Sequence, residues 1–385
     1  MILHIGAMKT ATTYLQGMLQ GHRELLGEHG WFVPAQGPLV TGVREILALN
    51  GAPLAPEWPT WDRVVRRARR HAARGTILSM EFLSFAHEAG ARRIVDSLAG
   101  MDVHVVLTVR DAAAALPSQW QSLCRNRGVL SWSEFMGDLA DDAARRDRRT
   151  PSPAARAFER TQHISRMLEV WRSVVGEERI TVVTVPHPSQ QAPPDEVWWR
   201  FLSVAGIGRG EATFGEADFE NPRLGYESCD LLRRLNGAGL STVPVSRYRP
   251  VMRHLGRRHL LALRSTESRP ELDAAGAAFA ASVNAETRSA VSGIQVVGSP
   301  EADLPADPPA DLAQAVTEPS LEGVWRALAA AETGIADYAM EKGVELPPAV
   351  GADPSDLDAR VQSLATVIRS AMTGESPGPS AGAGH

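Results

Sequence analysis

The first thirteen residues constrain the fold of this chain more than any other stretch. Ile2, Leu3 and Ile5 form a short apolar run, which is typical of a buried parallel strand. Gly6 permits a sharp turn, and a helix is predicted from about residue 13 to residue 28. A strand that feeds a helix through such a turn leaves the first N–H groups of the helix without intrahelical partners. The stretch therefore predicts an anion site.

The turn also carries side chains suited to a phosphate-like group. Lys9 supplies a positive charge, and Thr10, Thr12 and Thr13 supply hydroxyls. The order differs from a Walker A loop, because Lys9 lies only three residues after Gly6 and Ala11 stands where a second glycine would be expected. A structural strand, turn and helix with an exposed lysine is the alternative.

The order G-x-x-K-T-x-T-T over residues 6–13 resembles the 5′-phosphosulfate loop of sulfotransferases that use 3′-phosphoadenosine 5′-phosphosulfate. The usual form in that family is close to P-K-T-G-T-T, so Met8 replaces the proline and Ala11 the glycine. The resemblance implies that the co-substrate binds to the turn and that Lys9 also neutralises charge on the leaving phosphate oxygen. The implied contacts to the co-substrate come from Lys9, Thr10, Ala11, Thr12 and Thr13.

Strands and helices alternate along the first half of the chain. Strand-like runs at 76–85, 103–109 and 180–185 are separated by helical patterns, which predicts an α/β fold with a doubly wound, mostly parallel sheet. In such sheets, ligands bind beyond the carboxyl ends of the strands. Lys9, Glu81 and Arg110 follow or lie near such ends, so we expect them to converge.

Arg110 leaves the strand 103–109, and Ser118 follows eight residues later in a predicted helix. This spacing resembles the 3′-phosphate site of the same family, and it implies that Arg110 and Ser118 bind the 3′-phosphate. Weaker resemblance to bacterial members, at 182–207, 221–236 and 296–304, extends the match over about residues 1–305.

Transfer to a hydroxyl requires a general base. Many members of the family carry a histidine in the strand that matches 76–85 and others carry a glutamate, so the resemblance implies Glu81 as the base. A structural ion-pair role for Glu81 is the alternative. His87 and His104 are rival bases, although His104 begins its strand at the wrong end.

The composition of the 385 residues, 44% hydrophobic and 22% charged, is that of a soluble globular protein. A net charge of −5 argues against a nucleic-acid partner. The two cysteines provide no disulfide framework and no zinc cluster, and no metal site is expected. No apolar run approaches the ~20 residues of a membrane span, and the first strand starts too early for a signal peptide. A cytoplasmic location is therefore expected.

Composition and the extent of the resemblance suggest three parts. Residues 1–305 form the sulfotransferase domain, 306–374 a helical extension with helices at 321–342 and 355–372, and 375–385 a disordered tail. Within the first part, 35–60 is predicted as a loop with a short helix at 43–49. Two more segments are predicted to lack structure, a mobile stretch at 127–158 and a linker at 300–310.

The expected activity is sulfuryl transfer from 3′-phosphoadenosine 5′-phosphosulfate to a hydroxyl or amine of a small-molecule or carbohydrate acceptor, with adenosine 3′,5′-bisphosphate as product. A P-loop kinase or NTPase is one alternative, and it would need a metal ion. A nucleotide-binding protein without catalytic activity is the other.

Overall fold

The structure is a computed structural model. It describes residues 1–49, 54–71, 73–144, 151–211, 214–215, 223–308, 312, 314–347, 353 and 355–374. The predicted tail at 375–385 lies outside these residues.

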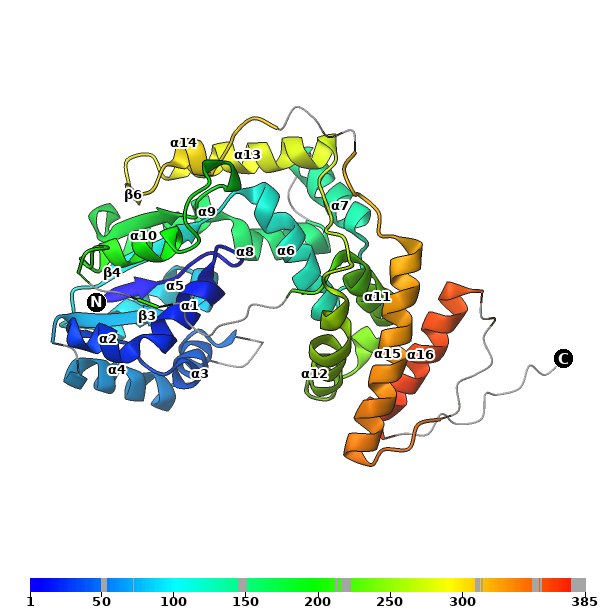
Figure 1. The fold of residues 1–385 in the computed structure, drawn as a ribbon. Coiled ribbons are helices and arrows are strands. Elements are labelled where there is room, and N and C mark those ends of the chain that lie inside the picture. The colour runs from blue at the N-terminus through cyan, green and yellow to red at the C-terminus, as the bar shows by residue number, and fades with distance from the viewer. Residues whose placement is uncertain are drawn as a thin grey trace. The chain divides into compact units, whose positions relative to one another are not determined.

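The chain forms two compact units that interleave along the sequence (Figure 1). The first contains Met1–Ala115, Arg145–Asn221 and Ala277–Pro309. The second contains Leu116–Ala144, Pro222–Gly276 and Ala310–His385. Residues from Ala310 onward therefore group with two earlier stretches of the chain.

The first unit is built on a six-stranded parallel sheet in the order β2-β3-β1-β4-β5-β6. The strands are β1 (Ile2–His4), β2 (Trp31–Phe32), β3 (Gly75–Ser79), β4 (His104–Val109), β5 (Ile180–Thr184) and β6 (Gln295–Val297). Leu3 of β1 pairs with Leu78 of β3 and with Val105 of β4, so the first strand lies inside the sheet. The predicted parallel α/β sheet is confirmed.

Successive residues of β1 point to opposite faces of the sheet. Ile2 packs in one core with α1 (Thr12–Gly21) and α10 (Glu196–Val204). Leu3 packs in the other core, together with helices α3 (Gln36–Ile46), α4 (Pro59–His71), α5 (Glu88–Ser97) and α9 (Ile164–Val175). The chain therefore leaves β1 over one face and reaches β5 through α9 over the other. This arrangement confirms the doubly wound fold and makes the gap between the carboxyl ends of β1 and β4 a topological switch point.

The sequence mispredicted the first part of the segment 35–60, which is a helix rather than a loop. It forms α3, because Leu39, Val43 and Ile46 are buried at helical spacing, and α4 starts at Pro59. Gly42, which suggested a loop, is needed where two helices meet. A Cβ on it would lie 2.9 Å from the Cα of Trp61.

Three other boundaries differ from prediction. The helix predicted over 13–28 ends at Gly21, and a second helix, α2 (Arg23–Glu28), follows it. The strand predicted over 76–85 ends at Ser79 and continues as the 3₁₀ helix η2 (Glu81–Phe85). The stretch 127–158 contains α7 (Trp132–Ala144) and the start of α8 (Pro153–Gln162), so its described part is helical rather than a mobile segment. Ser152 caps α8 by accepting from the backbone N–H of Ala155 at 3.1 Å.

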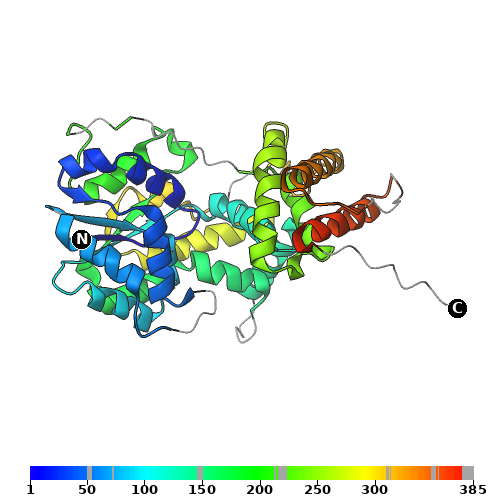
Figure 2. The same cartoon turned by 90° about the horizontal axis from the view of Figure 1, so that it is seen from below.

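The second unit is helical. Its elements include most of α6 (Ala112–Arg125), α7, α11 (Tyr226–Gly237), α12 (Val245–His254), α15 (Leu321–Lys342) and α16 (Leu357–Thr373). The last two, which lie side by side in Figures 1 and 2, confirm the predicted helices at 321–342 and 355–372. Buried Glu227 of α11 accepts hydrogen bonds from Ser268 and from the N–H of Ser320. This carboxylate ties the start of α15 to the earlier helices. No helix within the described residues is long and apolar enough to cross a membrane.

The described part of the predicted linker, residues 300–308, contains an anchor of the sheet. Asp303, at the end of α14 (Pro300–Asp303), is fully buried. Its carboxylate accepts from Thr184 Oγ1 at 2.5 Å and from Arg200 Nη1 at 2.6 Å, which joins β5, α10 and α14. Burial opposes its ionisation, but the hydrogen bonds from Thr184 and Ser299 and the Arg200 guanidinium outweigh burial and hold the pKa of Asp303 below its ordinary value.

We predict that Asp303→Asn lowers the free energy of unfolding by about 1.5–3 kcal/mol, because it removes the buried carboxylate that accepts from Arg200 Nη1, while Glu196 still pairs with Arg200 Nε. Urea unfolding at neutral pH measures this loss. The matched control is Asp307→Asn, four residues on and exposed, which should change stability by less than about 0.5 kcal/mol.

The lowered pKa of Asp303 also predicts how the stability of the protein depends on pH. A depressed pKa contributes stability above the unfolded value of about 3.9, and that stability is lost as the pH falls through the folded pKa. The wild-type protein should lose this increment below about pH 4, and Asp303→Asn should not. Equal acid sensitivity of the two proteins would contradict the role given to Asp303.

Candidate active site

The turn between β1 and α1 has an unusual backbone. Gly6, Lys9 and Ala11 have φ angles of 43°, 67° and 63°. A Cβ on Gly6 would lie 2.4 Å from Cγ2 of Thr12, so a glycine is required there. Ala11 is the N-cap of α1, and its methyl group cannot accept a hydrogen bond from the helix. Helix α1 therefore opens at the carboxyl end of β1 without a side-chain cap.

Hydrogen bonds to β4 hold the turn in this conformation. The N–H groups of Ile5 and Ala7 donate to the carbonyls of Val106 and Thr108, at 2.9 and 3.2 Å. Thr10 Oγ1 donates to the carbonyl of Ala7 at 2.7 Å and lies 2.7 Å from Thr108 Oγ1. The turn thus continues the β1–β4 pairing beyond the last residue of β1, and Lys9 is held beside the end of β4.

Below the turn lies a buried histidine that the sequence analysis did not assign to the site. His4 Nδ1 is 2.7 Å from Ser79 Oγ, and its Nε2 is 3.2 Å from Thr108 Oγ1. Burial lowers the pKa of His4 to about 3, so the ring is neutral. A polar residue inside an apolar strand was the available signal in the sequence.

The donor and acceptor in each of these hydrogen bonds follow from the bond between Thr10 and the Ala7 carbonyl. Thr10 uses its only hydroxyl proton on the Ala7 carbonyl, so Thr108 donates to Thr10, and His4 Nε2 donates to Thr108. Nδ1 of His4 then accepts from Ser79. The chain runs from β3 through β1 and β4 to the turn.

Helix α8 holds the turn from the other side. The N–H of Met8 donates to the carbonyl of Thr161 at 3.3 Å, and the side-chain amide of Gln162 donates to the Met8 carbonyl. Gln162 is buried, and sequence reasoning missed it because its partner Met8 lies 154 residues earlier in the chain.

The structure distinguishes the residues predicted to bind the co-substrate. The hydroxyl of Thr10 is used inside the protein, and the methyl group of buried Thr12 packs against Gly6. Thr13 is exposed, while Lys9 and Ala11 are half-buried. What this turn offers an anion is therefore the positive end of α1 and the charge of Lys9.

Arg110 directly follows β4, at the same edge of the sheet as the turn. The next residue, Asp111, is buried, and its carboxylate accepts from Asn284 Nδ2 at 2.8 Å and from the N–H groups of Ala113 and Ala114. Ser118 lies on α6 within the second unit, so its part in the site stays a prediction. Within the described residues, no cluster of three or more His, Cys, Asp or Glu side chains is arranged to hold a metal ion.

Glu81 begins η2, and its Oε2 accepts from Gln16 Nε2 of α1 at 2.6 Å. The structure therefore joins Glu81 to the helix that the turn opens, through a neutral amide rather than a cation. His87 caps α5 and is exposed. His104 lies at the amino end of β4, 2.7 Å from Thr181 Oγ1 and away from the carboxyl edge.

The chain was compared with protein-family models, curated proteins and solved structures. No protein-family model matches the chain, and no curated protein matches it. Among solved structures it is similar to the crystal structure of a sulfotransferase from Alicyclobacillus acidocaldarius, with 14% identity and a TM-score of 0.40. That match covers 64% of this chain and 98% of the other.

The left-handed backbone at Ala11 leads to a direct prediction. A Cβ costs about 1–2 kcal/mol in this region, and glycine avoids the strain at some cost in chain entropy. Ala11→Gly should therefore raise the free energy of unfolding by about 0.5–1 kcal/mol, measured by urea unfolding. The control is Ala278→Gly, at an exposed position of helix α13 (Ala274–Ala290), which should lower stability by about 1 kcal/mol. Destabilisation by both substitutions would contradict the backbone described for the turn.

Proposed function

We propose that this chain transfers a sulfuryl group from 3′-phosphoadenosine 5′-phosphosulfate to a hydroxyl or amine of a small-molecule or carbohydrate acceptor. The observation that carries the proposal is the turn at Lys9 and Ala11. It opens an uncapped helix at the topological switch point of a parallel sheet, and it presents one lysine there. This geometry suits a phosphosulfate, and its residues resemble the family's phosphosulfate loop, with Met8 and Ala11 in place of proline and glycine.

In the proposed reaction the bound co-substrate supplies the sulfuryl group. The N–H groups at the start of α1, from Thr12 and Thr13, bind its 5′-phosphate. Lys9 stabilises the charge that develops on the leaving phosphate oxygen. Thr10 acts indirectly, because its hydroxyl fixes the turn rather than the ligand.

Arg110 and Ser118 are assigned to the 3′-phosphate, which distinguishes this nucleotide from ADP. Arg110 emerges beside the turn, and a guanidinium matches the oxygens of a phosphate. The kinase or NTPase alternative has less support. The carboxylate after β4, Asp111, accepts from three N–H groups of the protein, whereas such enzymes use a carboxylate at a strand end to bind the metal.

Glu81 is assigned as the general base. Its contact with Gln16 supports this assignment, because the amide orients one carboxylate oxygen beside α1 and leaves the other, Oε1, to accept the acceptor's proton. A structural ion-pair role for Glu81 has less support, since the partner is neutral. His87 is the remaining candidate for a base.

Arg110→Ala should weaken binding of adenosine 3′,5′-bisphosphate by about 2–4 kcal/mol, because it removes the cation that pairs with the 3′-phosphate. Binding of ADP, which lacks that phosphate, should hardly change. Titration calorimetry with both nucleotides measures the difference. Arg179→Ala, at the amino end of β5, removes an equal charge and should leave both affinities unchanged. Equal losses for both nucleotides after Arg110→Ala would show that Arg110 does not recognise the 3′-phosphate.

Glu81→Gln should lower kcat by about 10²–10⁴-fold, because it retains the shape of the side chain and removes the base. Nucleotide affinity and melting temperature should stay near those of the wild type. Gln16→Ala provides the comparison, since it frees Glu81 without removing the base and should cost much less activity. Full activity of Glu81→Gln would exclude Glu81 from the chemistry and leave His87 as the candidate.

A further inference from the structure

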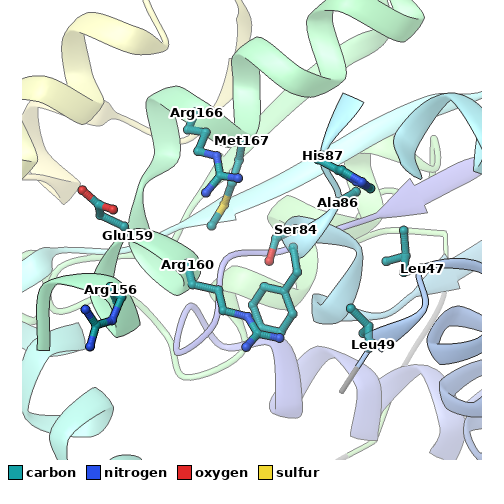
Figure 3. A pocket seen from close by; sticks show the side chains of 11 residues that line it. Leu47, Leu49, Ser84, Ala86, His87, Arg156, Glu159, Arg160, Arg166 and Met167 are labelled. Atoms are coloured by element: carbon teal, nitrogen blue, oxygen red, sulfur yellow. The ribbon is translucent and has the colours of Figure 1, made fainter. Parts of the chain in front are cut away.

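The first unit contains a pocket of about 520 Å³ that is separate from the residues assigned above (Figure 3). Three segments line it. They are the end of α3 and the residues after it, the stretch from η2 to the start of α5, and the helices α8 and α9. In Figure 3, Ser84 lies in the middle of the lining, with Arg160 and Arg166 on one side and Leu47 and Leu49 on the other.

The charge of this lining is strongly one-sided. The lining contains three arginines, Arg156 and Arg160 of α8 and Arg166 of α9, and one carboxylate, that of Glu159. The formal charge of the lining is therefore +2 when His87 is counted as neutral. Within the described ranges, none of these three arginines is ion-paired. Arg156 donates to the carbonyl of Pro151, and the guanidinium of Arg160 lies 4.5 Å from the centre of the Phe85 ring. All three side chains are exposed, and their like charges around one hollow give it a positive potential.

Apart from Ser84 and His87, the remaining lining is apolar. Leu47, Leu49, Phe85 and Met167 supply hydrocarbon, aromatic and thioether surface, and Phe85 is stacked on Phe82 with ring centres 5.6 Å apart. A ligand that matches both halves of the lining combines an anionic group with an aromatic or aliphatic body.

Two elements connect this pocket to the candidate active site. Helix η2 begins with Glu81, the assigned base, and supplies Ser84 and Phe85 to the pocket. Helix α8 supplies Arg160, and its next two residues hold Met8 of the turn. A ligand bound here therefore lies beside the elements that carry the base and the turn.

We infer that this pocket binds the acceptor and that the acceptor carries an anionic group, such as a carboxylate, sulfate or phosphate, on an apolar body. The inference rests on the proposed function. Arg160 and Arg166 bind the anion, the apolar lining covers the body, and the hydroxyl to be modified extends toward Glu81.

The probes for this inference are 4-hydroxyphenylacetate and its neutral amide, which share the phenol and differ in charge. Saturation-transfer NMR gives the affinity of each in the presence of adenosine 3′,5′-bisphosphate. The acid should bind at least tenfold more tightly than the amide. Arg160→Gln and Arg166→Gln should each weaken acid binding about tenfold and leave amide binding unchanged. Phenyl sulfate and phenyl phosphate, as competitors, show which anion is preferred.

Arg66→Gln is the matched control. It removes an exposed arginine of α4 outside the pocket lining, and should affect neither probe. Equal affinity for acid and amide, or acid binding insensitive to both pocket variants, would overturn the inference. A parallel loss of adenosine 3′,5′-bisphosphate affinity in the pocket variants would also overturn it, because the pocket would then belong to the nucleotide. Arginine-dependent acid binding without any nucleotide binding would refute the proposed function and leave the anion preference of the pocket intact.

Discussion

The hydrogen bond between the hydroxyls of Thr10 and Thr108 is the contact on which the candidate site depends most. It connects the turn after β1 to the last residues of β4, and it ends the buried chain that begins at Ser79 and passes through His4. Because the His4 ring is neutral and both its nitrogens are used, the chain has one proton order and one geometry. Lys9 and Ala11 keep their left-handed backbone conformation because three sets of contacts hold the turn together. They are this chain of hydrogen bonds, the backbone hydrogen bonds to β4 and the contacts from α8.

This arrangement also explains why the chain tolerates Ala11 at the position where the family that its motif resembles has glycine. The strain at Ala11 is small compared with the several hydrogen bonds that hold the turn, and Gly6 provides the position that no side chain could occupy. The threonines of the motif differ in their surroundings. Thr10 and Thr12 face the protein, whereas Thr13 is exposed at the first turn of α1.

Much of the first unit could be predicted from the sequence because its strands are buried on both faces and appear as continuous apolar runs. The runs containing β1, β4 and β5 are of this kind, and they correctly predicted the parallel sheet. Composition gave wrong predictions of loops and linkers where a glycine or a polar residue is buried in a packing contact. Gly42 marks a helix contact rather than a loop, and Asp303 is a buried anchor rather than part of a linker.

The candidate site was predictable only in part, since its supporting contacts join segments far apart in the sequence. Lys9 and Arg110 could be placed at one sheet edge from the order of the strands alone. The partner of Glu81 was not predictable, because Gln16 lies 65 residues away. The arginine-lined pocket is likewise assembled from three separate segments, and no local pattern indicates it.

We propose that the turn and Arg110 form a site for a 3′-phosphorylated adenine nucleotide. The decisive experiment is thermal unfolding with adenosine 3′,5′-bisphosphate, compared with ADP and with ATP plus Mg²⁺. Adenosine 3′,5′-bisphosphate should stabilise the protein by about 2.7 kcal/mol at a hundredfold excess over its dissociation constant, and the other two nucleotides at the same concentration should stabilise it much less. Equal or greater stabilisation by ATP with Mg²⁺, and none by adenosine 3′,5′-bisphosphate, would show that the site does not recognise the 3′-phosphate.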